Sequence, residues 1–130
     1  MTEGQAAVVA AARACLGARF RLHGRDPSHG LDCVGLVARA YALSDVPAGY
    51  RLRGGREEAV LAALDRLGFR DAEGASPADL LLLRPGPFQL HLAIATASGF
   101  VHADAGLRRV VEVPGLPRWP LVARRHRPRG

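Results

Sequence analysis

The sequence predicts a single α+β domain in which N-terminal helices pack on a mostly antiparallel sheet. Apolar residues recur at helical spacing in the first half of the chain, whereas short apolar segments separated by Gly, Pro and Ser fill the second half. Helices followed by strands are typical of α+β proteins, and 130 residues suffice for one hydrophobic core. We expect this domain to span residues 1–125 and residues 126–130 to form a basic, flexible tail.

Start and stop signals define three expected helices. They cover residues 6–16, 33–43 and 56–67. Thr2 and Gln5 precede the first helix in the spacing of a capping box, and Gly17 follows it as a stop signal. Asp32 is well placed as the N-cap of the second helix, and Gly68 ends the third. All three helices therefore lie in the first 70 residues.

The second half of the chain contains five expected strands. They cover residues 80–83, 90–96, 99–103, 108–113 and 119–124. Turn signals such as Ser76-Pro77 and Ser98-Gly99 separate them, and Trp119 is expected in the core. The segments 18–31 and 46–55 are rich in Gly and Pro, which predicts loops on either side of the second helix.

The chain is basic, with a net charge of +6, and all eighteen of its basic residues are arginine. A basic surface can attract nucleic acid or an anionic wall polymer. The arginines are nevertheless dispersed, and neither interleaved aromatic residues nor a recognisable nucleic-acid-binding motif accompanies them. Nucleic-acid binding therefore ranks last among the candidate functions.

Cellular location and cofactors are constrained by what the sequence lacks. Its apolar runs are too short to span a membrane, so we expect no membrane insertion. Glu3 precedes the apolar residues 6–12 and no basic segment does, so no signal peptide is predicted. The spacing of the histidines and cysteines is not that of a metal site, and no metal or cofactor is predicted.

The strongest functional pattern surrounds Cys33, which lies in the first turn of the second expected helix. Backbone N–H groups and the positive end of the helix dipole favour a reactive thiolate at such a position. His91 and His102 follow on two neighbouring expected strands and could supply a base and its orienting partner. Purely structural roles fit the same spacing, as does a disulfide between Cys15 and Cys33 that would consume the nucleophile. We interpret the pattern as that of a cysteine hydrolase.

Four blocks of sequence strengthen this interpretation. They are Gly17-Ala18-Arg19-Phe20-Arg21 with Gly30-Leu31-Asp32-Cys33-Val34-Gly35-Leu36-Val37, then Ser76-Pro77-Ala78-Asp79-Leu80, His91-Leu92-Ala93-Ile94 and Phe100-Val101-His102-Ala103. In this order they resemble the motifs of the NlpC/p60 peptidoglycan endopeptidases, a papain-like group. The blocks extend over roughly residues 6–125, and their order and spacing make the resemblance specific.

The resemblance implies a papain-like NlpC-type fold and a role for each site residue. Cys33 would be the nucleophile, His91 the general base and His102 the residue that orients His91. Such an enzyme would hydrolyse a peptide bond of a bacterial peptidoglycan stem peptide through a thioester acyl-enzyme, without a cofactor.

Asp32, Phe20 and Val34 would lie where the family binds substrate. Relatives usually carry Tyr and Ser at the positions of Phe20 and Val34, and these hydroxyls help them recognise a free amine. The two departures imply a different bond, a different stem-peptide context or a decayed binding site.

The resemblance is greatest to short members encoded with phage tails and gene-transfer particles. Val34 after the cysteine and the ending Val110-Val111-Glu112-Val113-Pro114 with Trp119-Pro120-Leu121 carry this likeness. It implies phage-like tail or baseplate proteins as partners, synthesis in the cytoplasm, and action from an assembled particle at the periplasmic cell wall. The alternative is a structural tail-tip or adaptor protein that kept the fold and lost activity.

Overall fold

The computed structural model describes residues 1–44, 46, 52 and 56–127, and these residues form an α+β domain. The helices are α1 (Glu3–Ala14), α2 (Cys33–Ala40) and α3 (Glu57–Arg66). The strands are β1 (Arg25–Asp26), β2 (Gly30–Leu31), β3 (Arg70–Asp71), β4 (Leu80–Gly86), β5 (Gln89–Ala95), β6 (Gly99–Asp104), β7 (Arg109–Pro114) and β8 (Leu121–His126). The predicted fold class is confirmed.

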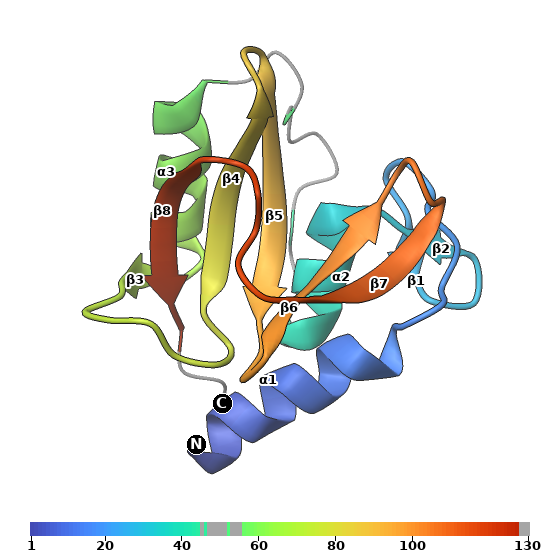
Figure 1. Ribbon diagram of the computed structural model, residues 1–130, viewed down its shortest axis with the longest axis horizontal. Helices are drawn as coiled ribbons and strands as arrows, with labels where there is room; N and C mark the ends of the chain where they lie inside the picture. The colour runs from blue at the N-terminus through green and yellow to red at the C-terminus, as the bar shows by residue number, and fades with distance from the viewer. Residues whose placement is uncertain (45, 47–51, 53–55, 128–130) are drawn as a thin grey trace.

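One six-stranded antiparallel sheet organises the domain, in the order β3-β8-β4-β5-β6-β7. Figure 1 shows α2 and α3 behind this sheet, α1 along its lower end, and the connection between β7 and β8 in front of it. The strands β1 and β2 form a separate small hairpin before α2. The sheet therefore has a helix-covered face and an opposite face, which we call the outer face.

Alternation along the strands divides the core between these two faces. Leu92 and Ile94 of β5 pack in the main core with the helices, whereas Ala93 pairs with Leu81 and joins a smaller cluster on the outer face. Because successive side chains of a strand point to opposite faces, His91 of β5 belongs to the outer face. By the same alternation His102, between Val101 and Ala103 of the main core, also lies on the outer face.

The strands β5 and β6 separate towards the two histidines. Over the whole described length of both strands, β5 and β6 pair with each other at two positions, Ile94 with Val101 and Ala95 with Phe100. Figure 1 shows β6 turning away from β5 beyond this point, and α2 contacts both strands. The separation opens the sheet near the N-terminus of α2.

Most boundaries predicted from sequence agree with these elements. The capping box of Thr2 and Gln5 at α1 is confirmed, as is Asp32 as the N-cap of α2. The predicted break at residues 46–55 lies mostly outside the described residues. In the described part of the chain no helix is long and apolar enough to cross a membrane.

The expected domain boundary at residue 125 falls inside β8, which continues to His126. Arg127 Nε also donates a hydrogen bond of 2.7 Å to the carbonyl of Leu67. Pairing and this hydrogen bond therefore hold the first two residues of the expected tail, and residues 128–130 lie outside the described chain.

Candidate active site

The first turn of α2 places Cys33 in a buried position at the helix N-terminus. Asp32 caps this helix, because its Oδ1 accepts a hydrogen bond of 2.8 Å from the N–H of Gly35. The Cys33 side chain is 7% exposed, and both cysteines are free thiols, so no disulfide consumes the sulfur. The N–H groups of Cys33 and Val34 lie beside the sulfur at the positive end of the helix.

The loop before α2 is fastened to the same carboxylate. Asp32 Oδ2 accepts from the N–H of His23 at 2.8 Å, and Asp32 Oδ1 accepts from Arg25 Nη1 at 2.9 Å. Gly35 and Gly24 let the loop and the helix approach closely, since a Cβ on Gly35 would meet the carbonyl oxygen of Gly24 at 2.0 Å. The loop is thus held in one position beside the cysteine.

The two histidines form a hydrogen-bonded pair. His91 Nε2 and His102 Nδ1 are 2.9 Å apart, and the rings are nearly perpendicular at a centroid distance of 5.1 Å. His102 is 3% exposed, which fixes the ring inside the fold. Because His102 occupies Nε2 of His91, Nδ1 is the nitrogen of the His91 ring that can bond to another group.

Asp104 continues the chain of polar groups beyond His102. Its Oδ2 lies 3.9 Å from His102 Nε2, while its Oδ1 accepts from the N–H groups of Gly106 and Leu107. One set of tautomers satisfies both contacts: His91 donates through Nε2 to Nδ1 of His102, and His102 carries its proton on Nε2, towards Asp104. In this state His91 Nδ1 has a free lone pair and can accept a proton.

Trp119 packs against both imidazoles. Its ring centroid is 5.6 Å from that of His91 and 5.7 Å from that of His102, in edge-to-face arrangements. Trp119 is partly buried and packs against the smaller core cluster on the outer face, so it lies at the edge of the core where the sequence led us to expect a core residue. Edge-to-face packing of this kind restricts the orientation of the imidazole rings.

A single cleft of about 600 Å³ brings together every site residue named from the sequence. Cys33, His91 and His102 line it from α2, β5 and β6. The three expected substrate-binding residues line the same cleft: Phe20, Asp32 and Val34. Among the described residues no three His, Cys, Asp or Glu side chains gather in a way that would hold a metal ion. The individual catalytic and binding roles stay predictions, but the positions are mutually consistent.

Burial controls the protonation of the cysteine. It raises the pKa of the Cys33 thiol to about 12, and the charge of Asp32 raises the pKa further, although the N–H groups of Leu92, Cys33 and Val34 oppose the rise. This burial opposes the thiolate that the helix N-terminus favours, and the resting state of the nucleophile stays a prediction to be tested.

The same physical effect keeps the histidines neutral. Burial, then repulsion by His102, lowers the pKa of His91 to about 4, while Asp104 raises it. Burial likewise lowers the pKa of His102, again against the charge of Asp104. A neutral His91 beside a neutral Cys33 can take up the thiol proton, which is the role of a general base.

Three residues of the site were missed by sequence reasoning: Arg25, Asp104 and Trp119. Asp104 carried a usable signal, since it follows His102 by two residues and therefore shares its face of the strand. Arg25 and Trp119 carried none, because their contacts depend on how a loop and the β7–β8 connection fold back on the site.

Comparisons with known proteins place this geometry in a familiar fold. No family model and no curated protein matches the sequence. Among solved structures, the NlpC/p60 domain of the peptidoglycan hydrolase SagA has a TM-score of 0.60 and 25% identity over 85% of this chain and 88% of its own.

Two further structures are similar. The peptidoglycan hydrolase RipB from Mycobacterium tuberculosis has a TM-score of 0.61 and 20% identity over 96% of this chain, which spans 64% of the RipB chain. The p60 domain of an antigen from M. avium subspecies paratuberculosis has a TM-score of 0.61 and 18% identity, with 96% and 94% coverage. The likenesses show the NlpC/p60 fold and support the NlpC/p60 family and a cell wall hydrolase function.

Proposed function

We propose that this chain is a cysteine peptidase or amidase that hydrolyses peptide bonds in the stem peptides of bacterial peptidoglycan. The observation that carries the proposal is the shared cleft, in which Cys33 at a helix N-terminus meets the hydrogen-bonded pair of His91 and His102. The similarity to the peptidoglycan hydrolase SagA supports the substrate class.

The reaction starts from neutral groups. His91 Nδ1 takes the proton of the Cys33 thiol as the sulfur attacks the scissile carbonyl carbon, and the proton then passes to the leaving amine as the C–N bond breaks. Water next gives a proton to His91 and attacks the resulting thioester, which releases the acid and restores the thiol. His102 and Asp104 hold His91 in the required tautomer and stabilise its transient positive charge.

The oxyanion of each tetrahedral intermediate would be bound by backbone donors. Asp32 already occupies the N–H of Gly35, so the N–H groups of Cys33 and Val34 are the first-turn donors nearest the sulfur. Donors fixed by a helix need no reorganisation during the reaction, which is why such groups contribute strongly to catalysis.

The substrate-binding wall is apolar and lacks a free carboxylate. Phe20 and Val34 present no hydroxyl, and Asp32 is engaged by Arg25, by His23 N–H and by Gly35 N–H. A substrate ammonium at this wall would have to compete with the Arg25 guanidinium. We therefore propose that Asp32 acts as an anchor of the loop, and that the peptide segment beside it is uncharged.

We further propose that the enzyme works from a phage-like tail, as the resemblance of its C-terminal part implies. The alternative is a structural tail-tip or adaptor protein with a decayed site. An intact set of Cys33, His91 and His102 in one cleft favours the enzyme, whereas Phe20 and Val34 are the features that favour the alternative.

Digestion of isolated Gram-negative peptidoglycan tests the proposal. Wild-type protein, Cys33→Ala and Cys15→Ala are incubated with sacculi, and released fragments are identified by mass spectrometry. Cys15 is a matched control, because it is also a buried free thiol but lies at the end of α1 outside the cleft. Fragments released by wild type and Cys15→Ala but not by Cys33→Ala would identify both the activity and the bond. No release by any of the three, alone or in an assembled particle, would favour the structural alternative.

A further inference from the structure

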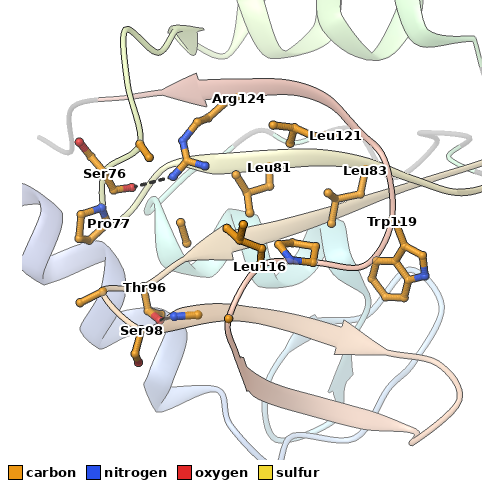
Figure 2. Close-up of a pocket in the computed structure, with 16 residues that line it drawn as sticks. Ser76, Pro77, Leu81, Leu83, Thr96, Ser98, Leu116, Trp119, Leu121 and Arg124 are labelled. Atoms are coloured by element: carbon orange, nitrogen blue, oxygen red, sulfur yellow. Dashed lines mark hydrogen bonds between the residues drawn. The ribbon is translucent and has the colours of Figure 1, made fainter.

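A second cavity lies on the outer face of the sheet, beside the catalytic cleft. This outer-face pocket has a volume of about 550 Å³, within the range of roughly 300–1,000 Å³ that is usual for ligand sites. Figure 2 shows its walls, formed by Leu81 and Leu83 of β4, by the turn that carries Thr96 and Ser98, and by the connection that carries Leu116. It is distinct from the cleft that contains Cys33.

The outer-face pocket and the catalytic cleft are both lined by residues of the outer face of the sheet. Leu83, which lines the pocket, pairs across the sheet with His91, which lines the cleft, and directly opposed residues of an antiparallel pair share a face. Trp119 lines both cavities and packs edge-to-face on both histidines. A chain that passes from Cys33 to the histidine side of the cleft can therefore continue past Trp119 into the pocket along the outer face.

The lining of the outer-face pocket defines the chemistry that it would accept. Most lining side chains are apolar, and the single charged one among the described residues is Arg124, whose Nε already donates to the buried Asp79 Oδ2 at 2.6 Å. Leu116 is 88% exposed and Leu121 52% exposed on the rim, so both present apolar surface that a bound group would remove from water. Because Asp79 already pairs with Arg124, uncharged aliphatic groups fit this wall.

We propose that the outer-face pocket is a second substrate subsite, which holds an aliphatic part of the same peptide whose scissile bond lies at Cys33. The inference rests on the proposed function. Binding energy from such a remote segment can position the scissile bond, so substrates long enough to fill both cavities would be bound and cleaved better than short ones.

Binding to inactive protein tests the subsite. In a Cys33→Ala background, the affinities for cross-linked muropeptide dimers, which carry two stem peptides, and for monomers are measured by calorimetry. Leu116→Ser should weaken dimer binding about tenfold, because a leucine would lose its apolar contact, and should leave monomer binding unchanged. Leu16→Ser is the matched control, since Leu16 is also an exposed leucine and lines neither cavity. Equal dimer affinity in Leu116→Ser and Leu16→Ser would overturn the inference.

An anilinonaphthalene sulfonate dye, which binds in apolar cavities, separates this result from the proposed function. Trp119, the single tryptophan, lines both cavities, so energy transfer from it reports dye in either one. The part of the signal that Leu116→Ser removes reports dye in the outer-face pocket. If wild-type protein cleaves sacculi but Leu116→Ser does not change dimer binding, the subsite is refuted and the proposed peptidase function still stands. Dye binding that depends on Leu116, in a protein that neither binds nor cleaves peptidoglycan, would refute both the subsite and the proposed function.

Discussion

At the scale of single residues, the neutral state of Cys33 has a direct chemical consequence. Burial raises the pKa of its thiol to about 12, so alkylation by iodoacetamide should increase steadily with pH and show no plateau between about pH 5 and pH 8. The measurement follows modification of Cys33 by mass spectrometry in a Cys15→Ala background. A plateau at neutral pH would instead show a preformed thiolate–imidazolium pair.

Asp104 offers a second test at this scale. Its charge raises the pKa of His91 and of His102, so Asp104→Asn should lower both pKa values and move the acidic limb of kcat/KM to lower pH. We expect kcat to fall roughly tenfold. This loss is smaller than the several kcal/mol that Coulomb's law gives for a screened pair of charges about 4 Å apart, such as Asp104 and a protonated His102. Asn can still accept hydrogen bonds from Gly106 and Leu107, so the melting temperature should change little. The exposed Asp71→Asn is the control, and an unchanged pH profile in Asp104→Asn would contradict the role.

The residues that could be predicted from sequence are those whose identity is fixed by local pattern. Cys33 follows an N-cap and begins a helix, and His91 and His102 lie in short recognisable strands. The contacts of Trp119 and Arg25 with the site could not be predicted, because neither residue shares a helix face or a strand face with a catalytic residue. The effect of burial on the pKa of Cys33 could not be predicted either, since the helix dipole is visible in the sequence and the depth of burial is not.

At the scale of elements, the contact between α2 and the preceding loop sets the position of Cys33. Gly35→Ala would place a Cβ 2.0 Å from the carbonyl oxygen of Gly24, so the loop or the helix must move. We expect a loss of about 1–3 kcal/mol in the free energy of unfolding, as is usual for overpacked sites, and a larger loss of activity than of stability. Gly74→Ala is the matched control because nothing lies within 4 Å of its Cβ. Equal stability of the two variants, measured by urea unfolding, would contradict the close contact.

Helices and longer strands were predictable because each spans enough residues to show a period. The predicted range 90–96 corresponds to β5 (Gln89–Ala95), and 99–103 to β6 (Gly99–Asp104). The two-residue strands β1, β2 and β3 are too short for any period to appear. The separation of β5 from β6 was equally hidden, since it depends on how α2 packs against both strands.

At the scale of the whole molecule, the catalytic groups come from opposite faces of one sheet. Cys33 belongs to the helix-covered core, whereas His91 and His102 lie on the outer face. The separation of β5 and β6 lets them line the same cleft. Burial within this opening lowers the pKa of both histidines, so the same packing that assembles the site also links its protonation to folding.

This linkage makes the stability of the whole domain depend on pH in a defined direction. In the unfolded chain His91 binds a proton near its ordinary value of 6.5, but in the folded chain its pKa is about 4. The contribution of His91 to the free energy of unfolding is therefore fully present above pH 6.5. It is lost as the pH falls towards 4, by on the order of 3 kcal/mol. Urea unfolding at stepped pH should show this slope in wild type and in the exposed His29→Gln, and a smaller slope in His91→Gln. The same slope in all three proteins would mean that His91 is not held neutral by the fold.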